Sequence, residues 1–211
     1  MTLPAHVPAP SALPALDGAS LDGRLYTRVT GLAGRSPGWF DALVSHWSAY
    51  GLGLFAVLML AAWWRARPGD APRLAMALAA PVVVVLAYAA NALIKALVRE
   101  QRPCRTLHTV TLEACPGPDD WSFPSNHAAL AAAAAAALWL VDRGIGALAA
   151  LAALLMALSR VWVGAHYPHD AVLGLVVGAA VGWCLTVAAR RGAPLVERAR
   201  ATRLRPLVAP R

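Results

Sequence analysis

The sequence predicts an all-α protein, a polytopic membrane helical bundle with about five transmembrane helices and an N-terminal interfacial helix. Apolar residues make up 59% of the 211 residues and charged residues only 14%, which is more apolar than ordinary soluble domains. Apolar runs that approach the roughly 20 residues needed to cross a bilayer also recur along the chain, separated by short polar turns. Both observations favour a membrane bundle.

The apolar runs predict five spans in succession. The third is short and contains seven consecutive alanines, Ala131–Ala137. A buried soluble helix or a low-complexity segment would also fit this run, but we favour a tightly packed membrane helix because small side chains let helix backbones approach closely. The five predicted spans cover residues 49–64, 74–98, 127–141, 145–163 and 169–189.

The N-terminal part of the chain differs from the spans in composition. Residues 1–23 are rich in Pro, Ala and Ser and lack the features of a signal peptide, so we expect a loosely held tail. Residues 25–47 mix apolar and polar positions and are interrupted at Ser36-Pro37-Gly38, which predicts an interfacial helix, a break and then the first span. The expected regions are the tail and interfacial helix (1–38), the transmembrane domain (39–190) and a basic cytoplasmic tail (191–211).

The cationic residues predict the orientation. The net charge is +8, but the basic residues lie beside apolar runs and form no continuous stripe, so we expect no nucleic-acid partner. With five spans, 11 of the 19 basic residues fall on the side of the 65–73 turn, Arg143 and the C-terminus. That side should be cytoplasmic, which leaves the 99–125 loop and the 164–167 turn outside.

Three polar clusters then lie on the outer side. The first is Lys95-x6-Arg102-Pro103, and Lys95 is the single lysine of the chain, placed inside an apolar segment. Its ammonium could snorkel to the interface or contact an anion as a point charge. If the helix continued through this motif, the seven-residue spacing would place both cations on one face.

The second cluster is Pro124-Ser125-Asn126-His127, at the start of the third span. Ser125 is a good N-cap candidate, and a helix start offers free N–H groups and a positive dipole end to an anion. His127 would face that anion from the first turn. An ordinary capped helix with an interfacial histidine is the alternative.

The third cluster is Ser159-Arg160-x5-His166-x3-Asp170. An arginine can hold phosphate oxygens bidentately. The four-residue spacing lets Asp170 accept a hydrogen bond from one nitrogen of His166, which leaves the other nitrogen free as a nucleophile. We interpret the remaining histidines as interfacial or surface polar residues; they are His6, His46, His108 and His169.

Together, the three motifs resemble the signature of the type 2 phosphatidic acid phosphatase superfamily over residues 95–170. The resemblance departs at Asn126, where the family usually has glycine. Bacterial undecaprenyl-diphosphatase-like members are similar to this chain in placing Asn or Asp there. Asn126 could hydrogen-bond a second phosphate group, or it could cap the helix.

The resemblance implies a role for each motif residue. His166 would attack phosphorus and form a phosphohistidine, Asp170 would orient His166, and His127 would protonate the leaving oxygen and then activate water. No metal or other cofactor is implied, and the carboxylates are too few and too scattered for a two-metal site. The expected phosphate-binding residues are Lys95, Arg102, Ser125, Asn126 and Arg160.

The implied protein is an integral-membrane lipid phosphatase of the bacterial inner membrane, with its active site on the extracytoplasmic face. Undecaprenyl diphosphate is the first-choice substrate, and phosphatidic acid, phosphatidylglycerol phosphate or another polyprenyl phosphate is the alternative. A gap near the second, third and fifth spans could admit the lipid chain. A transporter would spread its charges through the membrane depth, and a vanadate-dependent peroxidase would be soluble, so both are disfavoured. Nothing indicates the oligomeric state.

Two of the three cysteines, Cys104 and Cys115, share the 99–125 loop. If this loop faces an oxidising compartment, a disulfide between them is plausible. Spacing alone does not fix the geometry that a disulfide needs, so a bonded pair and two free thiols both remain open.

Overall fold

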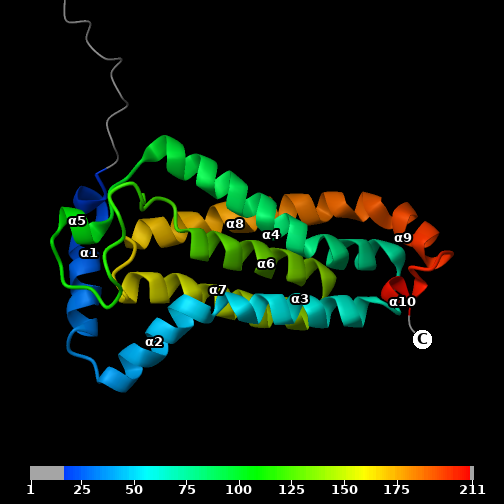
Figure 1. Cartoon of the computed structure of the whole chain (residues 1–211), viewed down its shortest axis with the longest axis horizontal. Coiled ribbons are helices and arrows are strands. Elements are labelled where there is room, and N and C mark those ends of the chain that lie inside the picture. The colour runs from blue at the N-terminus through cyan, green and yellow to red at the C-terminus, as the bar shows by residue number, and fades with distance from the viewer. Residues whose placement is uncertain (1–16, 210–211) are drawn as a thin grey trace, which may run out of the picture.

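In the computed structural model, which describes residues 17–209, all regular secondary structure is helical. The long helices lie side by side, α1 and α5 lie at one end of this bundle, and α9 and α10 lie at the other (Figure 1). This confirms the predicted all-α bundle. The helices are α1 (Gly18–Ala33), α2 (Gly38–Tyr50), α3 (Leu52–Ala66), α4 (Ala71–Val98), α5 (Pro103–Thr106), α6 (Asn126–Val141), α7 (Arg143–Trp162), α8 (Pro168–Ala189), α9 (Ala193–Arg200) and α10 (Arg205–Val208).

Three of these helices, α4, α7 and α8, are long and apolar enough to cross a membrane. A fourth span results if α2 and α3, which meet at a 55° bend, count as one. Helix α6 is apolar but has only 16 residues. Membrane-spanning helices are therefore confirmed within residues 17–209, whereas the number of five stays a prediction.

The closest helix pair in the bundle is α6 with α8. Three glycines of α8, spaced four residues apart, face the backbone of α6. A Cβ on Gly182 would lie 2.7 Å from the Ala133 Cα, and one on Gly174 would lie 2.6 Å from the Ser125 carbonyl oxygen. Most alanines of α6 are buried as well. The alanine run therefore belongs to a tightly packed helix, as predicted, because only small residues permit this approach.

The cationic turns gather at the end of the bundle opposite α1. Asp142, between α6 and α7, pairs with Arg73 at 3.2 Å and Arg65 at 3.4 Å. Arg200 of α9 donates to the Gly69 carbonyl at 2.7 Å, so the C-terminal segment folds back onto the α3–α4 turn. Helix counting predicted that these segments share one side. The residues expected as a basic tail form α9 and α10 there.

The N-terminal helix starts earlier than expected. Residues 1–16 of the predicted tail lie outside the described residues, but α1 begins at Gly18, so the expectation of loose chain to residue 23 is wrong for residues 18–23. Asp17 caps this helix by accepting from the Ala19 N–H at 3.2 Å. Tyr26 is fully buried, and its hydroxyl donates to the Gly164 carbonyl at 2.9 Å. These contacts fix α1 across the bundle end, while Leu25 remains half exposed, as an interfacial helix requires.

The α6–α8 contact yields a test with a matched control. Gly178→Ala should lower the free energy of unfolding by about 1–3 kcal/mol, because a Cβ there would overlap the Ala129 backbone. Gly53→Ala should raise it by about 0.5–1 kcal/mol, because no atom lies within 4 Å and alanine is the better helix former. Denaturant unfolding in detergent micelles measures both values. Equal effects in the two variants would contradict the packing argument.

Candidate active site

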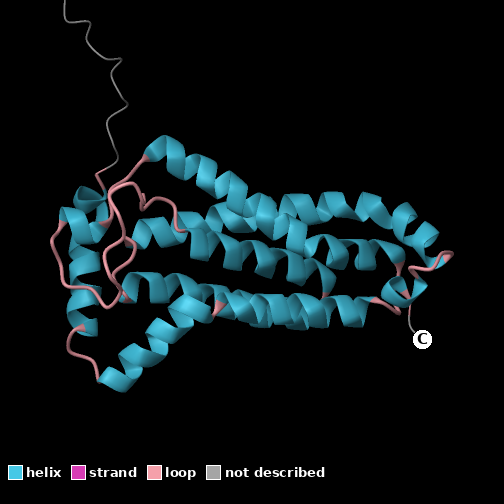
Figure 2. Cartoon of the chain, in the orientation of Figure 1, coloured by secondary structure: helices cyan, strands magenta, loops and turns pink. Residues whose placement is uncertain are grey.

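The three polar clusters meet at the end of the bundle where the long connecting loops gather beside α1 (Figure 2). The first and third clusters meet where Arg102 Nη1 donates to the Ala165 carbonyl at 2.8 Å. The second and third meet where the Ser125 N–H donates to the Asp170 carbonyl at 3.0 Å. Residues that are far apart in the sequence therefore form one site, as helix counting predicted.

His166 lies at the centre of this site, in the α7–α8 connection. Gly164 turns the chain there with a φ of 82°, and Pro168 starts α8. The Nε2 atom of His166 lies 3.1 Å from Arg102 Nη1, and its Nδ1 lies 3.3 Å from Asp170 Oδ2. A guanidinium only donates hydrogen bonds, so Nε2 must accept and Nδ1 must carry the proton. The contacts therefore select the tautomer whose Nε2 lone pair is available.

Asp170 is completely buried and tightly held. Its Oδ2 accepts from the Tyr167 N–H at 2.9 Å and from the Ser122 hydroxyl, in addition to facing His166. The predicted pairing with His166 is present in the structure. Ser122 was missed, because a serine in a long loop carries no sequence signal of its partner.

The environment of His166 favours its neutral form. Burial of the imidazole lowers its pKa well below the ordinary value, and the positive charges of Arg102, Arg160 and Lys95 lower it further. His127 contributes in the same direction, which places it within electrostatic reach of His166. A neutral, buried imidazole with a free lone pair has the properties of a nucleophile.

Arg102 and Lys95 converge, but not on one helix face. Helix α4 ends at Val98, as predicted for the second span, so the condition of a helix that continues through Arg102 is not met. The 99–125 loop folds back instead, with Arg102 pairing to Asp120 at 2.8 Å and Lys95 Nζ donating to the Trp121 carbonyl at 2.7 Å. Lys95 therefore does not snorkel into solvent; it binds oxygen atoms of the loop.

Arg160 is also paired with an anion of this loop. Its Nη1 lies 2.7 Å from Glu113 Oε1 and also donates to the Ser48 hydroxyl. The Arg160 Nε is buried and has no hydrogen-bond partner among the described residues. All three predicted cations are thus present at the site, and each is bound by oxygens that the sequence analysis did not identify.

A disulfide closes the 99–125 loop. Cys104 and Cys115 are bonded, with their Cα atoms 6.0 Å apart, so the bonded alternative is the one observed. Arg105 donates to the Pro116 carbonyl at 2.5 Å within the same loop. The loop that carries Glu113 and Asp120 is therefore tied to α5.

His127 lies in the first turn of α6, as expected, and is partly buried. Within residues 17–209, the His127 imidazole makes no hydrogen bond. Its ring is therefore available to a ligand at the site.

Ser125 and Asn126 differ from expectation in their partners. Ser125 occupies the N-cap position of α6, but its hydroxyl makes no capping bond and has no partner among the described residues, so the expected side-chain cap is wrong. Asn126 Oδ1 instead accepts from Asn91 Nδ2 at 2.7 Å. Asn91, fully buried in α4, also donates to the Pro124 carbonyl at 3.2 Å. Because Oδ1 of Asn126 is occupied, its amide presents hydrogen-bond donors to a ligand.

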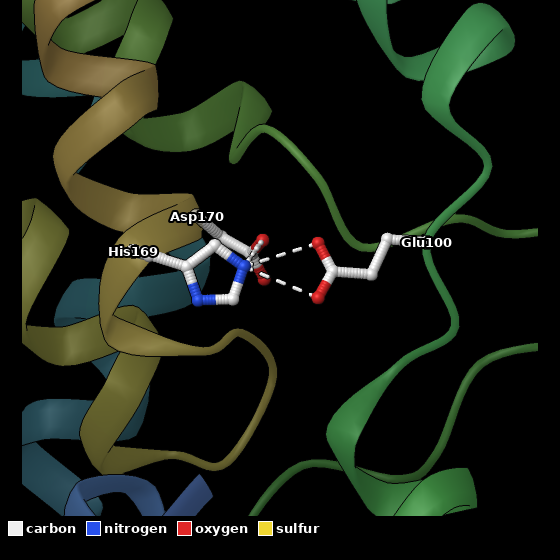
Figure 3. A group of neighbouring side chains, drawn as sticks. All are labelled: Glu100, His169 and Asp170. Atoms are coloured by element: carbon white, nitrogen blue, oxygen red, sulfur yellow. Dashed lines mark hydrogen bonds and ion pairs between the residues drawn. The ribbon is translucent and has the colours of Figure 1, made fainter. Parts of the chain in front are cut away.

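His169 is not the interfacial residue that we expected. Its ring faces the buried Glu100 carboxylate and lies beside Asp170 (Figure 3). The Nε2 atom is 3.1 Å from both Glu100 oxygens and 3.4 Å from Asp170 Oδ1. Glu100, His169 and Asp170 are also the one group among the described residues whose donor atoms lie close enough to hold a metal ion, within 4.8 Å of one another.

Comparison with known proteins supports the interpretation of the three motifs. The sequence model of the PAP2 superfamily, the type 2 phosphatidic acid phosphatases, matches residues 74–192. The undecaprenyl-diphosphatase BcrC of Bacillus subtilis is 32% identical over 68% of this chain and 72% of its own. The decaprenylphosphoryl-5-phosphoribose phosphatase of Mycobacterium tuberculosis is 42% identical over 46% of this chain. The matched region covers 52% of that relative's length.

A solved structure shares the fold. The crystal structure of Aquifex aeolicus LpxE superposes with a TM-score of 0.59, covering 80% of this chain and 95% of LpxE, at 22% identity. The family match covers more than half of the chain and includes all three clusters. The chain therefore belongs to the PAP2 superfamily and is a membrane phosphatase of that family.

Proposed function

We propose that this protein hydrolyses a phosphate group from a lipid carrier through a phosphohistidine on His166. The observation that carries the proposal is the tautomer of His166, whose Nε2 lone pair faces the Arg102 guanidinium. A phosphate that replaced this contact would lie between the nucleophile and the cations. The imidazole is already oriented by Asp170 for an in-line attack.

In the first step, His166 Nε2 bonds to phosphorus and the bond to the leaving oxygen breaks, with His127 donating the proton to that oxygen. Asp170 stabilises the positive charge that forms on the imidazole. In the second step, His127 takes a proton from water, the water oxygen attacks phosphorus, and the phosphorus–nitrogen bond breaks. No atom other than those of the protein, the lipid and water enters this sequence.

The cations stabilise the phosphate oxygens as charge develops. Lys95, Arg102 and Arg160 would exchange their present oxygen partners for phosphate oxygens. The Asn126 amide and the free N-terminal N–H groups of α6 would add neutral donors. The chain residues therefore suffice for a metal-independent mechanism.

Undecaprenyl diphosphate, hydrolysed to undecaprenyl phosphate, is the proposed substrate. Its support is the similarity to proteins named undecaprenyl-diphosphatase in Bacillus subtilis and Sulfolobus acidocaldarius. The similarity to decaprenylphosphoryl-5-phosphoribose phosphatases favours a phosphomonoester on a polyprenyl-linked sugar as a second candidate.

An apolar groove on the structure supports a binding site for the lipid chain. This groove of about 740 Å³ lies between α1, α2 and α7, and its lining includes Ser159, which precedes Arg160 in the chain, and Pro168, which follows the His166 turn. Helix α2 bends by 55° relative to α3 and contacts α7 where the Trp162 indole N–H donates to Asp41 Oδ1 at 3.0 Å, so it forms one wall of this groove. We place the prenyl chain here and not near α4, α6 and α8, where the sequence suggested a gap. A phosphate at Arg160 would direct its tail into the groove.

The site belongs on the extracytoplasmic face of the bacterial inner membrane in this proposal. The cationic turns and the C-terminal segment share the opposite end of the bundle, which the positive-inside tendency assigns to the cytoplasm. The disulfide in the 99–125 loop fits an oxidising compartment on the active-site side.

The nucleophile is tested directly by His166→Ala. Phosphate release should fall by at least about a thousandfold, because the covalent step is lost. The assay uses purified protein with undecaprenyl diphosphate, a polyprenyl-linked sugar phosphate, phosphatidic acid and phosphatidylglycerol phosphate, with and without chelator. His46→Ala, at an exposed histidine of α2, is the control and should behave as wild type. Full turnover in His166→Ala would refute the mechanism.

The lowered pKa of His166 predicts the pH dependence. An ordinary histidine is half protonated near pH 6.5, whereas His166 stays neutral well below that value because its pKa is lowered by burial. Protonation removes the nucleophilic lone pair, so the loss of kcat/KM on acidification should begin only below the range in which an ordinary histidine titrates. A pH–rate profile of kcat/KM provides the measurement. The prediction would be contradicted if the rate of phosphoenzyme formation fell with a midpoint at about pH 6.5.

The groove is tested by Leu158→Trp, which narrows it. KM for a long-chain prenyl diphosphate should rise about tenfold, equivalent to about 1.4 kcal/mol, while hydrolysis of a short, water-soluble prenyl diphosphate should not change. Leu151→Trp is the matched control, because Leu151 is similarly exposed on α7 but lies outside the groove. Equal effects on long and short substrates would show that the tail binds elsewhere.

A further inference from the structure

The mechanism leaves one buried titratable residue without a role, His169. Its two ring nitrogens face carboxylates from different parts of the chain. Nδ1 lies 2.9 Å from Asp22 Oδ1 on α1, and Nε2 lies 3.1 Å from both oxygens of Glu100. The His169 backbone N–H also donates to Asp22 Oδ2 at 2.8 Å. His169 therefore joins α1, the segment after α4 and the start of α8.

These contacts determine the charge of the His169 ring. A neutral imidazole has one N–H and can donate to only one of two carboxylates, whereas the imidazolium donates from both nitrogens. Glu100 is 1% exposed, and His169 is the sole hydrogen-bond partner recorded for its carboxylate among residues 17–209. A buried carboxylate requires a paired cation. The imidazolium satisfies both requirements at once.

The same ring is the nearest cation to the catalytic carboxylate. Asp170 Oδ1 is buried, accepts no hydrogen bond among the described residues, and lies 3.4 Å from His169 Nε2. The other oxygen, Oδ2, faces His166. The Tyr167 ring stacks on His169 at 5.4 Å with an interplanar angle of 18°, which fixes the plane of the imidazolium. Asp170 is thus held between two histidines, one at each oxygen.

Helix α1 is fitted closely to this cluster. A Cβ on Gly18 would overlap Glu100 Oε1 and would lie 2.8 Å from His169 Cε1. Only glycine allows the first residue of α1 to approach so closely. Asp22 then places both carboxylate oxygens on His169. The position of α1 and the charge arrangement around Asp170 are therefore coupled.

We propose that His169 is a positioning residue for phosphate hydrolysis. As an imidazolium held by Asp22 and Glu100, it is the counter-charge that keeps Asp170 ionised and directed at His166. Docking of α1 through Asp22 is then part of assembling the active site. This inference rests on the proposed function, because Asp170 has this role only if His166 is the nucleophile.

The test compares His169→Gln with His46→Gln, which alters an exposed histidine outside the site. Glutamine keeps hydrogen-bonding atoms but not the charge. We expect kcat to fall roughly ten- to hundredfold, as when other groups that orient a reactive residue are removed, with KM changed less than about twofold because the phosphate-binding cations are intact. The acid limb of kcat/KM should also move to higher pH, since a carboxylate without its counter-charge binds a proton more readily. A merely structural role would not move this limb.

Wild-type kcat and an unshifted pH profile in His169→Gln would overturn the proposal. If that variant does not fold, Asp22→Asn provides the test, because it removes the charge of one of the two carboxylates that hold His169. We expect a kcat lowered about three- to tenfold and faster hydrogen exchange over residues 18–33; wild-type values of both would overturn the proposal.

Two further results separate this inference from its alternatives. In the first, wild-type activity is lost in chelator and restored by a divalent cation. This result would assign the group of Glu100, His169 and Asp170 to a metal ion and would refute the proposal that His169 is an imidazolium. An inactive wild-type protein on every lipid would refute the proposed function, and the role of His169 with it. If the wild-type protein is active and the His169→Gln and Asp22→Asn variants are equally active, only the inference about His169 is refuted.

Discussion

The close approach of α6 and α8 is the constraint on which the rest of the structure depends. The glycines of α8 allow its backbone to touch the backbone of α6 along three turns. The same contact continues into the site, where Gly174 packs on the Ser125 carbonyl and the Ser125 N–H bonds to the Asp170 carbonyl. Packing of α6 against α8 therefore sets the distance between the second and third clusters. A larger side chain in this seam would separate His127 from His166 without altering either residue.

Charge balance is the second requirement, and the 99–125 loop provides it. Lys95, Arg102 and Arg160 would repel one another if they were buried together without anions. Glu113 and Asp120 of the loop supply two carboxylates, and the Trp121 and Ser122 carbonyls bind Lys95. The disulfide and α5 hold the loop in position. The loop thus stabilises a group of cations that the helices alone could not assemble.

Much of the fold and the core of the site could be predicted from sequence. Hydrophobic runs locate the helices, and a spacing of four residues places Asp170 beside His166, because both are local properties of the chain. The partners of Arg160, Asn126 and His169 could not be predicted. They depend on the path of a long loop and on the docking of α1, which no periodicity encodes. The bend near Gly51 likewise depends on packing, because a Cβ on this glycine would lie 2.8 Å from the Met156 methyl group of α7.

The pairs at the site fall into two kinds, and this difference matters for the proposed reaction. Asp120 is 49% exposed and Glu113 is 32% exposed, whereas the Arg102 and Arg160 side chains are only 7% and 8% exposed, so water can stabilise the released carboxylates but not the arginines. A phosphate dianion can replace both carboxylates with the same total charge and with several charge-assisted hydrogen bonds at once. Asp170, in contrast, is fully buried and bound on both sides, so it stays in place when the substrate arrives. The buried arginines can therefore exchange a solvent-accessible carboxylate for a phosphate, while the proposed nucleophile is oriented by a carboxylate that remains buried.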